Sequence, residues 1–271
     1  MKGLVWLEAL LVASWLHMAW QTSLAAAQGS QKQTRALAEG EKRASPRPEE
    51  ASAVATLENA GATLDYDEEG YVRSVELHDS KITDEALAVI AQLSRLETLN
   101  IGGGKVTDEG LVHLRHMTRL QRLYLNRLPI TDAGLANFAK LRSLEVLSLS
   151  DTRVTGKGLA HIIHLPNLHV LNLTRARITD EALRQLRSLK DLDTLVLEGT
   201  KVTGAGLAYL RALPKLRVLN INRCNINDQD LYNLVGLDNL RMLYVRGCNV
   251  TEANIEEFKK KMNSLAVFYW H

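Results

Sequence analysis

Hydrophobic residues recur along the chain with a period of 24 residues from about Val72 onwards. Each unit opens with apolar residues at its first, fourth and sixth positions, as in Leu168, Leu171 and Leu173. The last two of these are two residues apart, which is the spacing of a strand that turns one face towards a core. The pattern therefore predicts a short β-strand at the start of every unit.

The second half of each unit predicts a turn followed by a helix. Thr179 and Asp180 illustrate the helix start, because Thr and Asn cap helix N-termini and an acidic residue in the first turn suits the helix dipole. Leu183, Leu186 and Leu189 follow at a spacing of three, on one helical face. The same marker occurs at Thr83-Asp84, Thr107-Asp108, Thr131-Asp132, Thr155-Gly156, Thr203-Gly204, Asn227-Asp228 and Thr251-Glu252.

A column of small residues precedes the buried face of these predicted helices. Glycine inside a helix costs roughly 1 kcal/mol relative to alanine. Its repetition therefore predicts a close approach between each helix and its neighbours. The column holds Ala86, Gly110, Gly134, Gly158, Ala182 and Gly206.

One such unit cannot bury its apolar face alone, whereas stacked copies can, so the repeats predict a solenoid. The Leu-x-x-Leu-x-Leu opening resembles a leucine-rich repeat. The 24-residue unit with Ile-Thr-Asp-x-Gly-Leu, as in Ile130 to Leu135, is similar to repeats abundant in planctomycete and related bacterial proteins. The resemblance implies an α/β fold, a right-handed leucine-rich-repeat solenoid with parallel strands on the concave face and helices on the convex face. It also implies recognition of a partner on that concave face.

The chain before the repeats divides into three segments. Residues 1–27 carry Lys2, an apolar run and then Ala25 to Ala27, which predicts a secretory signal peptide; an uncleaved membrane anchor is the alternative. Residues 28–48 are polar and end in Ser-Pro-Arg-Pro, as expected of a disordered tether. Residues 49–71 suit a helix and hairpin that cap the solenoid. We therefore expect an exported protein, periplasmic, in the cell envelope or secreted.

Eight repeats fill residues 72–263, and residues 264–271 read as a C-terminal capping strand. Here the pattern degrades, because Lys261 replaces an apolar residue and Phe268 would stand at an open sheet edge. Such an edge is either shielded by its own aromatic side chains or covered by another chain. A homodimer through this edge is therefore an open alternative to self-capping.

Basic residues form a row in the turns that follow the strands. With 33 basic and 31 acidic residues in total, net charge says little about partners, so only the distribution is informative. We name Arg153, Arg177 and Lys201 the ledge. Like charges about 5 Å apart repel one another unless an anion neutralises them. The row thus predicts an acidic partner. The alternative is a solvated edge balanced by the nearby acids Asp79, Asp151 and Glu198.

The exposed face of the predicted strands supplies a second set of candidate contacts. Mixed aromatic, amide and basic side chains suit a recognition surface, in which aromatic anchors carry much of the binding energy. Valine and tyrosine also simply favour strands. The candidates are Tyr124, Asn172, Asn220, Tyr244 and Arg246.

Cys224 and Cys248 occupy the same column of adjacent units. Strand spacing of about 4.8 Å would allow a disulfide in an oxidising compartment. We favour free thiols, because this column holds small, semi-buried residues elsewhere. Related repeats of the cysteine-containing class in F-box proteins often place cysteine there, although no F-box-like helical segment precedes the repeats here.

No constellation of residues predicts catalysis or a cofactor. Gly102 to Lys105 resembles a phosphate loop, but Val106 stands where Ser or Thr is required. The pairs His113/His116 and His161/His164 lack a further metal ligand in their units.

We therefore expect a non-catalytic scaffold that binds a protein or an acidic polymer, with no nucleic acid, no metal and no cofactor. Membrane contact is expected only if the N-terminal segment stays uncleaved. A structural, self-assembling component of the cell envelope is the alternative function. An enzyme whose site converges across repeats is a weaker one.

Overall fold

The computed structural model describes residues 46–78, 81–262 and 264–269, all of which belong to a compact unit formed by Pro46–His271. The predicted signal peptide and residues 28–45 of the predicted tether lie outside the described residues. The candidate acid Asp79 lies outside them as well.

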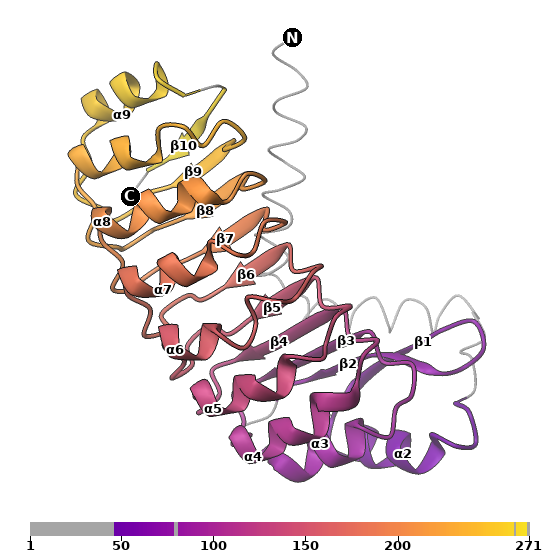
Figure 1. Ribbon diagram of the computed structural model, residues 1–271. Coiled ribbons are helices and arrows are strands. Elements are labelled where there is room, and N and C mark those ends of the chain that lie inside the picture. Colours follow the sequence, from indigo (N-terminus) through magenta and orange to yellow (C-terminus); the bar gives the residue numbers. More distant parts are fainter. Residues whose placement is uncertain (1–45, 79–80, 263, 270–271) are drawn as a thin grey trace. The chain divides into compact units, whose positions relative to one another are not determined.

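The described strands form one sheet of ten strands in sequence order (Figure 1). The hairpin strands β1 (Thr63–Tyr66) and β2 (Val72–Leu77) pair antiparallel, and every later neighbouring pair is parallel. Leu99, Leu123 and Leu147 stand opposite one another, so the register advances by one 24-residue unit per strand. The remaining strands are β3 (Thr98–Gly102), β4 (Arg122–Asn126), β5 (Val146–Ser148), β6 (Val170–Asn172), β7 (Thr194–Val196), β8 (Val218–Asn220), β9 (Met242–Tyr244) and β10 (Ala266–Phe268).

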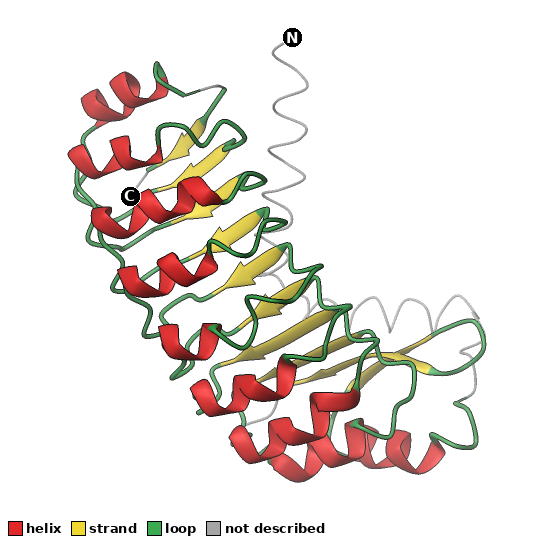
Figure 2. Ribbon diagram, viewed as in Figure 1, coloured by secondary structure: helices red, strands yellow, loops and turns green. Residues whose placement is uncertain are grey.

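Helices cover one side of this sheet, and the strands line the other, concave side (Figure 2). The predicted α/β solenoid is therefore confirmed. The α-helices are α2 (Ala51–Asn59), α3 (Asp84–Ile90), α4 (Asp108–Leu111), α5 (Asp132–Leu135), α6 (Gly156–Leu159), α7 (Asp180–Leu186), α8 (Gly204–Leu207) and α9 (Glu252–Lys259).

Several predicted helices are partly or wholly 3₁₀-helical. The 3₁₀ segments are η1 (Val112–His116), η2 (Ala136–Phe138), η3 (Ala208–Ala212) and η4 (Gln229–Leu234). A 3₁₀-helix rises about 2.0 Å per residue against 1.5 Å for an α-helix, so it crosses the same distance with fewer residues. A 24-residue unit leaves little chain for the return path, which favours the more extended helix.

The core lies between the sheet and the helices. In the unit that begins at Leu168, Leu171 of the strand, Leu173 just after it and the helix residues Leu183 and Leu186 are at most 1% exposed. These are the apolar columns that the sequence predicts. Because every unit repeats them, one continuous core runs along the described repeats.

Four threonines of the column, Thr107, Thr131, Thr155 and Thr251, cap their helices, whereas Thr83, Thr179 and Thr203 form no cap hydrogen bond. The adjacent aspartates do more than complement the helix dipole. The Thr131 hydroxyl accepts a hydrogen bond from the Ala133 amide, as predicted. The carboxylate of Asp108, one unit earlier, accepts hydrogen bonds from the Thr131 amide and hydroxyl at 2.8 and 2.5 Å. The same bonds join Asp84 to Thr107, Asp132 to Thr155, Asp180 to Thr203 and Asp228 to Thr251. Aspartate therefore links successive units.

These aspartates explain the glycine column. A Cβ atom at Gly134 would lie 2.5 Å from Oδ1 of Asp108, so the predicted close approach is confirmed. Gly110, Gly158 and Gly206 have the same relation to the aspartate of the preceding unit.

The first and last units are closed by different contacts. The Glu50 carboxylate is buried and accepts hydrogen bonds from the amides of Val72 and Ser94, both at 2.9 Å, which fixes the start of α2 against the sheet. At the other end, α9 buries Phe258, whose ring meets Tyr232 edge to face at 6.0 Å.

Candidate functional site

The ledge residues occupy equivalent points in successive turns. The backbone amides of Arg153, Arg177 and Lys201 donate to carbonyls of the preceding units at 3.0, 2.9 and 2.9 Å. Their side chains are all exposed. Since the strands feeding these turns are about 4.8 Å apart, the ledge presents one cation per unit in single file.

The acids nearest the ledge are bound by a different row of arginines. Arg175 donates two hydrogen bonds to the Asp151 carboxylate, at 2.5 and 2.6 Å, and Arg223 lies 3.5 Å from Glu198. The hydrogen bond from Arg175 holds the pKa of Asp151 below its usual value. Asp151 and Glu198 are therefore not free to balance the ledge.

Within the described parts of the chain, the ledge side chains form no ion pair or hydrogen bond. The turn geometry explains this division. Asp151 and Arg175 adopt left-handed backbone conformations with φ of 58 and 54°, two residues before Arg153 and Arg177, and they pair with each other across units. The ledge residues have no such partner among the described residues and keep an unbalanced positive charge.

The strand-face candidates lie in one column of the sheet. The register aligns Tyr124 of β4 with Asn172 of β6, Asn220 of β8 and Tyr244 of β9. Tyr124 and Asn172 are two strands apart, whereas Asn220 and Tyr244 are direct neighbours. Of these four candidates, only Asn220 and Tyr244 therefore lie on adjacent strands.

The side-chain oxygens of Asn172 and Asn220 already form hydrogen bonds within the protein. Asn172 Oδ1 accepts from the amide and the hydroxyl of Thr174, and Asn220 Oδ1 accepts from the amide of Asn222. Their carbonyl oxygens therefore fix the turns that follow β6 and β8. The amide nitrogens remain as donors.

The tyrosines are half-buried and remain protonated at neutral pH. Burial raises the pKa of both Tyr124 and Tyr244. The ring of Tyr244 stacks on Phe268, with centroids 4.6 Å apart and planes 14° from parallel. Each tyrosine offers an aromatic surface together with a hydroxyl group.

Arg246 does not project from a strand, contrary to the sequence prediction. The strand β9 ends at Tyr244, and the exposed Arg246 lies in the following turn, where its amide donates to Asn222 Oδ1 at 2.7 Å. A three-residue strand is long enough to cover the core. The alternation of apolar and polar residues continues through Val245 and Arg246, but these two residues already belong to the turn. The sequence alternation alone could not place this end of the strand.

Two polar residues beside Tyr124, Asn100 and Glu76, are not among the candidate contacts predicted from the sequence. Asn100 of β3 is 2% exposed, and its Oδ1 accepts no hydrogen bond from any described residue. Next to it in β2, burial and then the charge of Asp65 raise the pKa of Glu76. Their column position was readable from the sequence, but their burial was not.

Cys224 and Cys248 are free thiols in the structure. Their Sγ atoms lie 3.2 and 3.1 Å from the carbonyl oxygens of Leu197 and Ile221 in the preceding units. Burial raises the pKa of both thiols, to about 11 for Cys248. Because the thiolate is the reactive form, a raised pKa makes both cysteines less reactive, and a role in packing suits them better.

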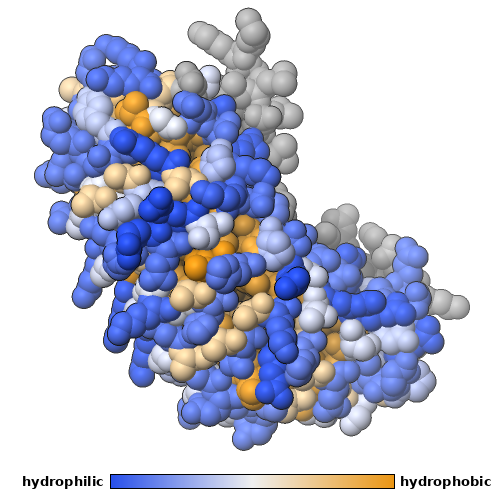
Figure 3. Space-filling view, in the orientation of Figure 1, coloured by the Kyte–Doolittle hydropathy of each residue, from blue (hydrophilic) through white to orange (hydrophobic). Residues whose placement is uncertain are grey.

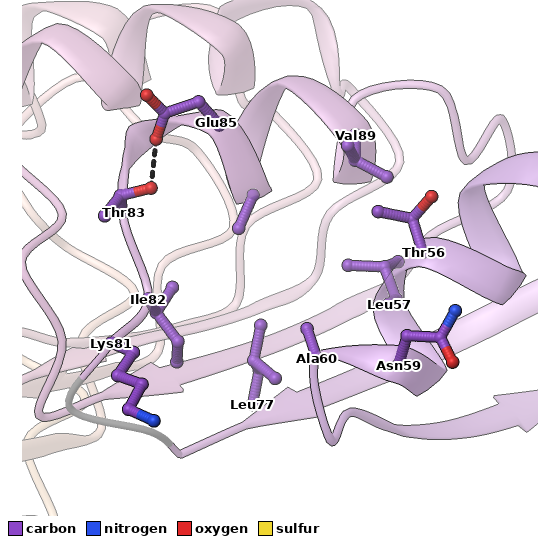
Figure 4. A pocket seen from close by; sticks show the side chains of 11 residues that line it. Thr56, Leu57, Asn59, Ala60, Leu77, Lys81, Ile82, Thr83, Glu85 and Val89 are labelled. Carbon is purple, nitrogen blue, oxygen red and sulfur yellow. Dashed lines mark hydrogen bonds between the residues drawn. The ribbon is translucent and has the colours of Figure 1, made fainter.

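A hollow lies between α2 and α3, and none of the candidate residues lines it (Figure 4). Thr83 and Glu85 are hydrogen-bonded to each other at its margin, whereas Leu57, Leu77 and Ile82 make its floor apolar. No group of three or more His, Cys, Asp or Glu side chains suited to a metal occurs among the described residues.

Hydrophilic residues cover most of the face seen in Figure 3, and hydrophobic residues show between them in the middle of the view. No helix within the described segments is long and apolar enough to cross a membrane.

Comparison with known proteins gives the class of this fold. A sequence profile described as "Leucine Rich repeat" matches residues 93–114, 140–162, 164–186 and 212–235. Internalin C2 from Listeria monocytogenes is similar in structure, with a TM-score of 0.57 and 22% identity over 84% of this chain and 95% of that one. The chain therefore contains leucine-rich repeats and has the fold of a leucine-rich-repeat solenoid.

A more distant solved structure is a plant peptide hormone receptor, RGFR1, in complex with RGF2. Its TM-score is 0.48 and its identity 17%, with 77% of this chain covered. The chain spans 36% of the length of that receptor chain. No curated protein sequence matches this chain.

Proposed function

We propose that this protein is a non-catalytic recognition scaffold that binds an acidic ligand, either an acidic protein segment or an acidic polymer. One observation carries the proposal: Asp151 and Glu198 are bound by Arg175 and Arg223, which leaves the ledge without an acidic partner among the described residues. Unmatched like charges in single file repel one another. A linear anion relieves that repulsion.

The strand face supplies the contacts that give such binding specificity. Extended concave surfaces of solenoids commonly serve for binding. Tyr124 lies beside the buried Asn100 in the sheet, and Tyr244 adds a stacked aromatic pair with Phe268. We propose that the ledge attracts the ligand and that these residues select it.

The cellular location belongs to the same proposal. The sequence of residues 1–27 supports export, and the polar residues 28–48 would then separate the repeats from the site of cleavage or anchoring. An exported scaffold would meet its ligand in the periplasm, in the cell envelope or outside the cell.

The test uses immobilised polyglutamate as a linear acidic probe and the full chain as the ligate. We expect Arg153→Gln/Arg177→Gln/Lys201→Gln to bind roughly tenfold more weakly than the wild type, since each exposed charge contributes a few tenths of a kcal/mol or more. Raised salt should reduce wild-type binding towards the level of the variant.

A matched control removes three cations elsewhere, in the variant Arg119→Gln/Arg142→Gln/Arg187→Gln. This variant has the same net charge as the ledge variant and should keep wild-type binding to polyglutamate. Equal binding by the ledge variant and the wild type would rule out the ledge as the binding site.

A further inference from the structure

A second basic surface lies at the opposite ends of the strands. In five successive units, the end of the helix and the loop that leads to the next strand stack side by side; we call this surface the basic edge. Backbone hydrogen bonds of 2.8 to 2.9 Å join Gln121, Glu145, His169, Asp193 and Arg217 into one ladder. The basic edge comprises residues 115–121, 139–145, 163–169, 187–193 and 211–217.

Positive charge is concentrated there far beyond the average of the chain. These segments carry nine lysines and arginines but three acids, whereas the whole chain is nearly balanced at 33 and 31. Two of the three acids are already paired, Asp191 with Lys215 at 2.5 Å and Asp193 with Arg217 at 3.9 Å. The exposed basic residues are Arg115, Arg119, Lys140, Arg142, Arg187, Lys190, Arg211, Lys215 and Arg217.

Some of these cations have a structural role. Lys190 donates to the Ala212 carbonyl at 2.9 Å, and Arg211 donates to the Asn233 carbonyl at 2.9 Å, which satisfies groups at the ends of neighbouring helices. The side chains of Arg119, Arg142 and Arg187 make no such contact with the described residues. Helix capping therefore does not explain them.

The arrangement of these free cations is two-dimensional. Arg119, Arg142 and Arg187 occupy three different positions of the 24-residue unit, so they are spread along the chain direction as well as from unit to unit. From the first unit to the fifth the edge extends roughly 20 Å at the spacing of parallel strands. The ledge, in contrast, is a single file. A spread of charges fits a plane of anions better than one linear anion.

The residue types argue against single-stranded nucleic acid as the occupant. Proteins that bind such strands stack bases on aromatic side chains. None of the five segments contains Phe, Tyr or Trp. A surface that is basic, broad and free of aromatic residues is better suited to a layer of phosphate headgroups, which attract clustered lysines and arginines.

We propose that the basic edge binds the surface of an anionic phospholipid membrane. Contact is electrostatic, with the ends of the solenoid turns resting on the headgroups and no segment inserted. It uses residues that the ledge does not use. It is also distinct from any anchoring by the apolar residues 4–20.

Cosedimentation of the full chain with vesicles tests this proposal. The vesicles contain phosphatidylcholine with about one third phosphatidylglycerol, and vesicles of phosphatidylcholine alone serve as the neutral comparison. We expect wild-type binding to the anionic vesicles that weakens with salt. Arg119→Gln/Arg142→Gln/Arg187→Gln should bind about a hundredfold more weakly, because each cation near an anionic surface contributes roughly fivefold.

The ledge variant Arg153→Gln/Arg177→Gln/Lys201→Gln is the matched control, since it loses the same charge. It should retain wild-type binding to the vesicles. Binding through the apolar residues 4–20 would persist on neutral vesicles and in both variants, so the difference between the two variants isolates the basic edge.

Four results would overturn the proposal: no wild-type binding to anionic vesicles, equal binding by the edge variant, an equal loss in the ledge variant, or edge-dependent binding of soluble polyglutamate without binding to vesicles. The last would make the edge a polymer site. The ledge itself is tested by its own effect on polyglutamate binding, so failure of one proposal leaves the other standing.

Discussion

At the scale of single residues, aspartate and glycine in this protein occupy matched positions in successive units. Gly158 has no Cβ because Oδ1 of Asp132 would lie 2.5 Å from it. Where the aspartate position holds Gly156 instead, the partner in the next unit is Ala182, and a Cβ on Gly156 would come within 2.9 Å of the Ala182 Cβ. At each of these two contacts between neighbouring helices there is thus room for a side chain on one helix only, either the aspartate of the earlier unit or the alanine of the later one.

Substitution of Gly158 by alanine tests this account. Alanine is favoured over glycine in a helix by about 1 kcal/mol. We expect Gly158→Ala nevertheless to lower the free energy of unfolding by about 1–2 kcal/mol, because overpacking costs typically 1–3 kcal/mol and displaces the Asp132 carboxylate. Urea unfolding would measure the change.

The double variant Asp132→Gly/Gly158→Ala is the control, because it reproduces the natural pairing of Gly156 with Ala182. Its loss of stability should be smaller than the sum of the two single losses. A Gly158→Ala protein as stable as the wild type would show that the aspartate does not require the glycine.

At the scale of elements, four helix starts, those at Thr107, Thr131, Thr155 and Thr251, are fixed twice. The Thr131 hydroxyl accepts from the Ala133 amide within its own helix and donates to Asp108 in the preceding unit. This double role needs an aspartate one unit earlier. The helix that begins after Thr179 lacks it, because Gly156 stands there, and the Thr179 side chain forms no cap hydrogen bond.

This contrast provides a matched pair of substitutions. Valine keeps the shape of threonine but removes the hydroxyl. We expect Thr131→Val to cost about 1–2 kcal/mol of stability, through loss of the cap and of the bond to Asp108. Thr179→Val should stay within about 0.5 kcal/mol of the wild type.

Denaturant unfolding of both variants gives the comparison. Similar losses for the two would mean that the threonines act through strand or turn preference rather than through the hydroxyl. The charge of the ledge is also determined by an element, the turn after each strand. In these turns Arg175 binds Asp151, so Asp151 does not neutralise the ledge.

At the scale of the whole solenoid, from Pro46 to His271, each described strand pairs only with its neighbours in sequence. Stability in such an array is a sum of unit and interface contributions, so damage at an end need not spread. Two buried phenylalanines lie at different places in this array. Phe138 is in the third repeat, and Phe258 is in the last helix.

Phe258→Ala and Phe138→Ala should therefore differ in the extent of their effect. Each removes a fully buried ring at a cost of about 3–5 kcal/mol. We expect Phe258→Ala to speed amide hydrogen exchange in α9 and β10 and to leave β2 to β5 protected. Phe138→Ala should speed exchange in the units on both of its sides.

Exchange read by mass spectrometry along the chain distinguishes these profiles. A uniform rise across all repeats in both variants would indicate a single cooperative unit, in which case end-local opening does not occur. The proposed recognition surfaces would then respond to damage anywhere in the array.

The repeat, its register and its core could be predicted from local patterns in the sequence. These properties depend on residues close together in the chain, such as the alternation of Leu171 and Leu173 and the helical spacing of Leu183 and Leu186. Hydrophobic burial depends mainly on which face a residue occupies, and periodicity fixes that face. The threonine caps and the close approach at glycine followed for the same reason.

The roles of the charged and polar side chains, in contrast, depend on how the units stack in the fold. Asp151 stands two residues from Arg153 in the sequence, yet it pairs with Arg175 of the next unit, 24 residues away. Likewise, Asp108 reaches Thr131 across units, and Asn100 is left without a described partner. Hydrogen bonds and ion pairs require the distance between two atoms to be correct to within a few tenths of an ångström, and atoms of different units reach such distances only once the units are stacked.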